Sequence, residues 1–186
     1  MLRTFFTSDS HFGHANIIRY CQRPFADADE MDRAMIDIWN SVVDPRDTVY
    51  HLGDFSMIKP DQIALLLKKL NGTKHLIRGN HDPVHSNQVK GWSSVQEMAK
   101  IHVEGKSLFL CHYPMREWPG MWNGTIHLYG HVHGNFQPQP GSMEVSADVW
   151  GGKPVQIADI CDALEPFDPE VAKRHRADVL RLRKWE

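Results

Sequence analysis

Short apolar stretches that stop abruptly at metal-binding residue types recur along this chain, and this pattern constrains its fold more than any other feature. The clearest copy is residues 76–83, where an apolar run ends at Gly79 and is followed by Asn80, His81 and Asp82. A strand that ends in this way delivers polar side chains to the edge of a sheet. The alternative is an ordinary turn, because Gly-Asn and Asp-Pro are common loop dipeptides. The other copies of the pattern decide between these two interpretations.

The first eighty residues alternate between predicted strands and predicted helices. The expected strands cover residues 2–7, 48–52 and 74–78, and the expected helices cover residues 15–20, 29–43 and 60–70. In the two longer helices apolar residues recur at steps of three and four, which is typical of a helix that buries one face. Asp29 is expected to cap the first of these, and Pro60 fits the first turn of the second. The order favours a parallel sheet with crossover helices and therefore an α/β fold.

The second half of the chain has fewer helical signals and is expected to be rich in hairpins. The expected elements are strands at residues 95–103, 107–110, 125–129, 143–147 and 154–157, a short helix at 159–164 and a helical tail at about 169–186. Gly105 lies between the first two of these strands and indicates a hairpin turn. No internal repeat divides the 186 residues, and this length suits one domain with a substantial core.

Composition excludes several classes of protein. With 41% hydrophobic and 24% charged residues, the chain has the balance of a soluble globular protein, and its net charge of -2 gives no general attraction to nucleic acid. The three cysteines are far apart and form no CxxC motif, which argues against a disulfide framework or a zinc knuckle. The N-terminus lacks the apolar core of a signal peptide, and no run approaches the ~18 apolar residues of a membrane span. We therefore expect a cytoplasmic protein without a membrane partner.

Metal-ligand residue types gather at the ends of five expected strands. They are Asp9, His11, Asp54, Asn80, His81, His112, His131 and His133. A single histidine on an apolar strand is more often part of the core, but turn formation alone is a poor explanation for five successive strand ends of this kind. Residues far apart in sequence meet when neighbouring strands finish at one edge of a sheet, where open α/β folds place their sites. The pattern therefore predicts one metal site.

With these residues in place, the chain resembles the calcineurin-like metallophosphoesterase superfamily. The motifs that carry the resemblance are, in chain order, Asp9-x-His11, Gly53-Asp54, Gly79-Asn80-His81-Asp82, His112 and Gly130-His131-x-His133. Residues 8–18 are also similar to the start of a small bacterial and phage branch of that superfamily. The resemblance implies a four-layer sandwich of two mixed β-sheets flanked by helices.

The resemblance also implies a role for each motif residue. One metal would be bound by Asp9, His11, Asp54 and His133, and the other by Asp54, Asn80, His112 and His131. Asp54 would bridge the two ions, and His81 would face the substrate. Manganese, iron or zinc suits this combination of imidazole, carboxylate and amide oxygen better than calcium does.

A mechanism follows from this implied centre. Two divalent cations carry more charge than Asp9 and Asp54 neutralise, so the site would attract phosphate and turn a bridging water into hydroxide at neutral pH. That hydroxide would attack phosphorus directly, and no cysteine or serine stands in a nucleophile motif. His81 is the candidate general acid for the leaving alkoxide. Asp82 would hold the His81 imidazole in the required state, although a role as a loop cap before Pro83 fits equally well.

Three further residues are candidates for contact with the substrate: His14, Arg78 and Arg116. His14 would reach the bound phosphate or support the metal ligands. Arg78 would clamp phosphate or orient its neighbours. Arg116 begins a loop that contains Trp118 and Trp122, and these tryptophans would either stack a nucleic-acid base or cover the edge of the core.

The expected function is hydrolysis of small phosphomonoesters or phosphodiesters, nucleotides among them, with two metal ions as cofactors. After Gly53-Asp54 the chain reads Phe55-Ser56-Met57, whereas protein serine/threonine phosphatases carry Val-Asp-Arg-Gly there, which disfavours a protein substrate. One alternative is a non-catalytic metal-binding scaffold on the same fold. Another is a nuclease that binds nucleic acid through the tryptophan loop and the basic tail. The oligomeric state is not predicted.

Overall fold

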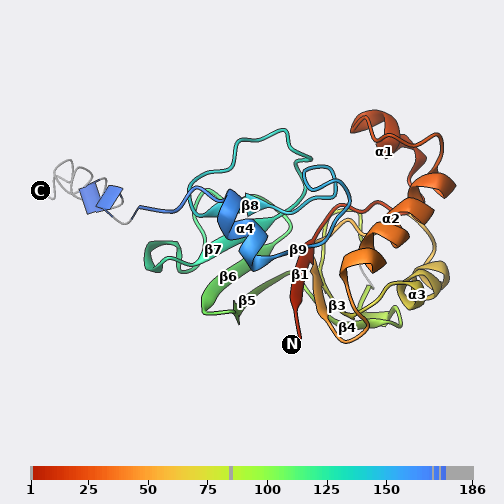
Figure 1. Cartoon of the computed structure of the whole chain (residues 1–186), viewed down its shortest axis with the longest axis horizontal. Coiled ribbons are helices and arrows are strands. Elements are labelled where there is room, and N and C mark those ends of the chain that lie inside the picture. The colour runs from red at the N-terminus through yellow and green to blue at the C-terminus, as the bar shows by residue number, and fades with distance from the viewer. Residues whose placement is uncertain (1, 84–85, 169, 172, 175–186) are drawn as a thin grey trace, which may run out of the picture.

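The computed structural model describes residues 2–83, 86–168, 170–171 and 173–174. Its first sheet has five strands in the order β4-β3-β2-β1-β9 (Figure 1). Their bounds are β1 Thr4–Thr7, β2 Thr48–His51, β3 Thr73–Ile77, β4 Trp92–Gln96 and β9 Val155–Gln156. Neighbouring strands from β1 to β4 run parallel, whereas β9 pairs with β1 in the antiparallel direction. The parallel sheet expected from the first half of the chain is therefore confirmed.

The helices lie close to the expected positions. They are α1 Ala15–Tyr20, α2 Ala28–Val42, α3 Pro60–Lys69 and α4 Ile157–Ala163, with single 3₁₀ turns η1 Ser86–Gln88 and η2 Met121–Asn123. The expected cap at Asp29 is wrong: the cap of α2 is Asp27, whose carboxylate accepts a hydrogen bond from the Glu30 amide at 2.8 Å. Asp29 lies in the first turn of α2, where an acidic side chain is also favourable, so the sequence does not separate the two positions.

The second sheet has four strands in the order β5-β6-β7-β8. Their bounds are β5 Met98–Val103, β6 Lys106–Cys111, β7 Ile126–Tyr129 and β8 Ser142–Glu144. The hairpin of β5 and β6 is as expected, but β6, β7 and β8 pair in parallel. This half is less rich in hairpins than the sequence predicts, because long loops rather than tight turns join these last three strands.

The expected single strand at residues 95–103 is wrong. The structure divides this segment at Glu97 into β4, which pairs with β3 in the first sheet, and β5, which pairs with β6 in the second. Strand propensity is continuous across the segment, and propensity does not record which sheet a strand joins. Glu97 marks the point where the chain crosses from one sheet to the other.

Two apolar layers hold the sheets and helices together. Phe5 belongs to a buried cluster with Trp39 of α2 and Leu67 of α3. The next residue, Phe6, belongs to a cluster with Leu108 of the second sheet, because consecutive strand residues point to opposite faces. Helices α2 and α3 therefore cover one face of the first sheet, and the second sheet packs on the other face (Figure 1). The expected fold of two mixed β-sheets flanked by helices is confirmed.

The strands expected at residues 143–147 and 154–157 and the helix expected at 159–164 are present with shifted ends. They correspond to β8, β9 and α4. Most of the helical tail expected at residues 169–186 lies outside the described residues. Among the described helices, none combines the length and apolar character needed to cross a membrane.

Candidate metal centre

The loops that follow β1, β2, β3, β6 and β7 bring the candidate ligands together. The amide of Asp9 donates to the Gly53 carbonyl at 2.9 Å, and the amide of His11 donates to the Asp54 carbonyl at 3.0 Å. The second sheet is tied to the first because the amide of His131 donates to the Asp9 carboxylate at 3.0 Å. The strand ends that the sequence predicts to form one site therefore lie side by side, at the carboxyl edge of the parallel strands.

Asp9, His11 and His133 form the first ligand group, with ligand atoms that all lie within 4.8 Å of one another. From Asp9 Oδ1, Nε2 of His133 lies 3.7 Å away and Nε2 of His11 lies 4.0 Å away. These separations are too long for hydrogen bonds, but they suit atoms that each lie about 2.0–2.2 Å from a shared ion. The Nε2 atom of His11 is buried and has no hydrogen-bond partner. A buried ring nitrogen without a hydrogen-bond partner is what we expect of a metal ligand.

Asp54, His112 and His131 form the second ligand group, again within 4.8 Å. Asp54 Oδ2 lies 3.5 Å from His112 Nε2 and 3.7 Å from His11 Nε2, so this oxygen stands between the two groups. Asn80 joins the second group because its Oδ1 lies 3.0 Å from His112 Nε2. The structure thus gathers all seven candidate ligands into two adjoining groups.

Burial and the charges of neighbouring ligand residues together shift the pKa values in both groups. Burial raises the pKa of Asp9 to about 6, although the charges of His112 and His133 act in the opposite direction. It lowers the pKa of His11 to about 3, so this imidazole is neutral and can donate a lone pair to a metal. Burial also acts to raise the pKa of Asp54, but the hydrogen bond and charge of His112 outweigh it and lower that pKa to about 2. Imidazoles beside carboxylates form a donor set that fits manganese, iron or zinc.

The backbone of five ligand residues is in a conformation that residues with side chains rarely adopt. The φ angles are 55° for Asp9, 52° for His11, 55° for Asp54, 76° for His131 and 50° for His133. Such residues each cost on the order of 1–3 kcal/mol and cluster at functional sites, where the surrounding structure holds them in place. The backbone of two glycines also packs directly against the ligand carboxylates, where a side chain would not fit. A Cβ atom on Gly79 would lie 2.3 Å from Asp54 Oδ1, and one on Gly130 would lie 2.3 Å from Asp9 Oδ2.

His81 lies at the centre, whereas the contacts of Asp82 are to the loop. The amide of His81 donates to Asp54 Oδ1 at 2.8 Å, its ring centroid lies 5.6 Å from that of His11, and the residue is exposed. The Asp82 carboxylate accepts hydrogen bonds at 2.8 or 2.9 Å from three backbone amides, those of Asp54, Phe55 and Gly79. Of the two roles that the sequence leaves open for Asp82, these contacts favour the loop cap.

Two residues that the sequence analysis missed support His133. Asp148 Oδ2 lies 2.7 Å from His133 Nδ1, and the guanidinium of Arg23 binds both carboxylate oxygens of Asp148 at 2.8 Å. Asp148 directly follows the strand expected at residues 143–147, so the strand-end pattern that identified the candidate ligands also points to it. Arg23 lies in a polar connection after α1 and carries no signal of this kind.

The residues predicted to contact the substrate have different surroundings. His14 lies at the centre, since its Nδ1 is 3.5 Å from Nδ1 of His11. Arg78 forms an ion pair with Glu97, at the crossing between the sheets. Arg116 is exposed and lines a pocket of about 300 Å³.

The two tryptophans of the 116–123 loop differ in burial. Trp118 is only 3% exposed, and its Nε1 donates to the Thr125 carbonyl at 2.7 Å, so this side chain covers the edge of the core. Trp122 is 48% exposed, and its Nε1 donates to Glu117 at 2.9 Å. Only Trp122 presents a face to solvent. The nuclease interpretation therefore loses one of the aromatic residues on which it rests.

Known proteins resemble this chain in sequence and in fold. A model of the calcineurin-like phosphoesterase superfamily domain matches residues 2–150. An uncharacterized protein of Methanocaldococcus jannaschii is 36% identical over 174 residues, which cover 89% of this chain and 93% of that protein. The gene 66 protein of Mycobacterium phage L5 is 30% identical, covering 81% of this chain and 89% of that protein. The crystal structure of a protein of unknown function from Aquifex aeolicus shares the fold, with a TM-score of 0.71, 24% identity, and coverage of 88% of this chain and 100% of that chain.

Proposed function

Because this chain belongs to the calcineurin-like phosphoesterase superfamily, we propose that it is a two-metal hydrolase of phosphomonoesters or phosphodiesters, with nucleotides as the favoured substrates. Family membership supports metal-dependent phosphoester hydrolysis in general. Family membership does not specify the number of metals, the roles of single residues or the substrate class. Our proposal for these rests on the geometry of the centre.

The position of Asp54 carries the proposal. One of its carboxylate oxygens lies within 3.7 Å of a histidine nitrogen in each ligand group, and the groups are otherwise built from different strand ends. Two sites that share one carboxylate would hold two ions close together, and two neighbouring ions would supply the charge stabilisation that in-line displacement at phosphorus needs. A single structural metal would need only one of these groups.

The chain itself supplies positioning and a proton. When bound, the ions act as Lewis acids that make water acidic and neutralise charge on the phosphoryl group. Asp54 is held by the backbone amide of His81 and, through its own amide, by the carboxylate of Asp82. We assign protonation of the leaving oxygen to His81, whose side chain is exposed beside the centre. We assign contact with a phosphate oxygen to His14, which lies beside His11.

The surroundings of the centre favour an aromatic organic group on the substrate. Asn80, His81 and His131 are exposed, so an ester group has room to leave the site on this side. Tyr113 is 45% exposed, and its ring centroid lies 4.7 Å from that of His131 and 5.1 Å from that of His112. A half-exposed aromatic face beside metal ligands suits the stacking of a nucleobase.

Replacing Tyr113 with leucine is expected to raise the KM for a nucleotide substrate ~5-fold or more, because stacking a base on an aromatic side chain is worth ~1–3 kcal/mol. The KM for glycerol phosphate, which offers nothing to stack, is expected to stay unchanged. Tyr113→Phe keeps the ring and should behave like the wild type. Steady-state kinetics on both substrates measure the effect.

Trp122→Leu is the matched control, because it removes another exposed aromatic ring that has no contact with the candidate ligands in the described residues. Equal changes of KM on both substrates in Tyr113→Leu would show that the ring does not select the organic group.

The function itself is tested with a panel of substrates. Protein loaded separately with manganese, iron or zinc is incubated with aryl phosphomonoesters, aryl phosphodiesters, cyclic nucleotides and oligonucleotides, and release of product is measured. We expect hydrolysis with at least one metal, and nucleotides among the better substrates. Protein that holds two metal ions and hydrolyses none of these compounds would favour the scaffold over the enzyme.

A further inference from the structure

Arg23 is a buried arginine whose hydrogen bonds converge on the first ligand group. It is 8% exposed, although it lies on the connection between α1 and α2. Its Nη2 donates to the Asp9 carbonyl at 2.7 Å, and its Nη1 donates to the Ser10 carbonyl at 2.8 Å. Burial of a guanidinium is tolerated only where its donors are satisfied and its charge is paired. These bonds hold the backbone around Asp9, whose φ is 55°.

Asp148 supplies the paired charge and also reaches a metal ligand. Its two oxygens each accept a hydrogen bond from Arg23 at 2.8 Å, in the bidentate geometry that suits a guanidinium. Its Oδ2 also lies 2.7 Å from His133 Nδ1. Because an ionised carboxylate only accepts hydrogen bonds, Nδ1 carries the proton and the lone pair of His133 is on Nε2. That Nε2 is the atom that lies 3.7 Å from Asp9 Oδ1.

We propose that Arg23 and Asp148 are positioning residues for one of the two metal sites, the site formed by Asp9, His11 and His133. Asp148 fixes the tautomer and the direction of the His133 ring, while Arg23 fixes Asp148 and the backbone of Asp9 at the same time. This inference rests on the proposed two-metal centre.

The second ligand group has a different support. His112 Nδ1 lies 2.8 Å from the backbone carbonyl oxygen of Leu52. Within the described chain, neither Arg23 nor Asp148 forms a hydrogen bond with Asp54, His112 or His131. The two metal sites are therefore expected to weaken separately. Loss of the Arg23 and Asp148 pair should lower the affinity of the first site and leave the second nearly unchanged.

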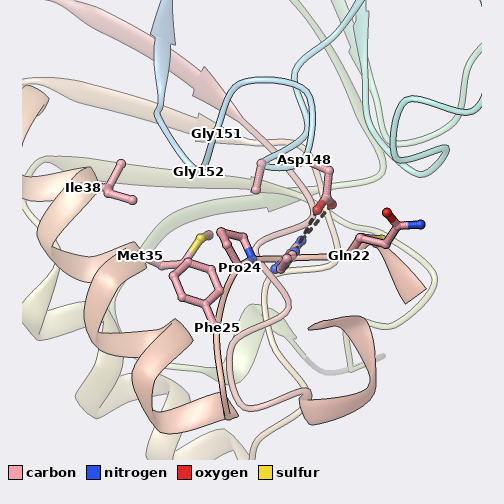
Figure 2. Close-up of a pocket in the computed structure, with 11 residues that line it drawn as sticks. Gln22, Pro24, Phe25, Met35, Ile38, Asp148, Gly151 and Gly152 are labelled. Atoms are coloured by element: carbon pink, nitrogen blue, oxygen red, sulfur yellow. Dashed lines mark hydrogen bonds and ion pairs between the residues drawn. The ribbon is translucent and has the colours of Figure 1, made fainter. Parts of the chain in front are cut away.

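A pocket of about 330 Å³ lies against this pair. It is lined by Arg23 and Asp148 together with apolar side chains that include Met35 and Ile38. Figure 2 shows Asp148 at the wall of this pocket, with dashed lines for its two contacts with Arg23. Truncation of Arg23 would enlarge this space beside Asp148 and leave the carboxylate without its partner. A free guanidinium ion can then enter from solvent and bind the carboxylate in the same bidentate way.

The first test replaces Asp148 with asparagine. Asparagine has one acceptor oxygen instead of two, so its NH2 group must face either an N–H of Arg23 or the Nδ1–H of His133. The direction of His133 Nε2 is then no longer fixed. We expect the first site to bind Co²⁺ ~10–100-fold more weakly, as is typical when the partner of a ligating histidine is lost. Co²⁺ titration of the metal-free protein, followed by visible absorption and equilibrium dialysis, measures both affinities.

Reference variants identify which site has been weakened. His133→Ala removes a ligand of the first group, and His112→Ala removes a ligand of the second. The Co²⁺ spectrum of Asp148→Asn with one equivalent bound should match that of His133→Ala and differ from that of His112→Ala. A match to His112→Ala would overturn the assignment.

The second test is chemical rescue of Arg23→Ala. This variant should lose ~10–100-fold in Co²⁺ affinity at the first site, and guanidinium at concentrations below those that unfold the protein should restore part of the loss. Urea, which has a similar shape but no charge, should restore none. Arg33→Ala removes an exposed arginine of α2 and serves as the matched control, with unchanged affinity.

Thermal unfolding of each metal-free variant shows whether it is folded. If Arg23→Ala does not fold, Arg23→Lys takes its place. Lysine keeps the positive charge but cannot form the two parallel hydrogen bonds of a guanidinium, so this variant should still weaken the first site alone. Wild-type affinity at both sites in folded variants would overturn the positioning role, as would an equal loss at both. A wild-type protein that binds fewer than two ions would instead contradict the proposed function, so the two failures are distinguishable.

Discussion

Replacing Asp54 with asparagine is expected to reduce phosphoester hydrolysis by ~10³-fold or more. The variant keeps the size of the side chain but removes one negative charge and replaces one carboxylate oxygen by an NH2 group, which does not bind metal. Because Asp54 Oδ2 lies 3.5 Å from His112 Nε2 and 3.7 Å from His11 Nε2, this single change affects both ligand groups. The loss corresponds to the several kcal/mol of transition-state stabilisation that metal ions supply. Metal content and turnover measured on the same sample check the result.

Asp37→Asn is the matched control, since it makes the same change of charge on an exposed residue of α2. It should keep both ions and wild-type turnover. An Asp54→Asn protein that still bound two ions with unchanged affinity would show that Asp54 is not the bridge between the groups.

Replacing His81 with alanine is expected to separate catalysis from metal binding. The candidate ligands are expected to stay in place because His81 hydrogen-bonds to them through its amide, which donates to Asp54 Oδ1, and alanine keeps that amide. Without the imidazole the leaving oxygen departs unprotonated, so the rate should fall by ~10²–10⁴-fold on alkyl esters. The loss should be smaller on nitrophenyl esters, whose leaving groups need little protonation. Turnover on the two classes of ester, with metal content determined alongside, measures both effects.

His102→Ala serves as its control, because it removes an exposed histidine from β5. An unchanged rate on the alkyl ester in His81→Ala would exclude His81 as the general acid. Loss of bound metal from that variant would mean that the imidazole supports the centre instead.

The location of the centre could be predicted because the sequence records where strands end. Each apolar stretch that stops at a glycine or a polar residue predicts a strand end, and parallel strands align those ends. This argument places Asp54 after β2 and Asn80 after β3 without any structure, and it extends to Asp148, which follows a predicted strand in the same way. The division of the ligands into two metal sites came instead from a resemblance to known proteins.

The parts that could not be predicted depend on contacts between distant segments. The crossing at Glu97 leaves no mark in strand propensity, because propensity does not record that β4 pairs with β3 of the first sheet and β5 with β6 of the second. Arg23 stands in a polar loop, where a buried and an exposed arginine look alike in sequence. The sequence does not separate the two roles of Asp82, support of the His81 imidazole or a loop cap. Its three hydrogen bonds from backbone amides favour the loop cap.

The most direct test of the central claim is the turnover of metal-free protein as a function of the equivalents of metal added. Two ligand groups that share Asp54 predict that phosphoester hydrolysis increases until two equivalents are bound and then stays constant. Full activity at one equivalent would contradict the two-metal centre, and no activity at two equivalents would contradict the phosphoesterase itself.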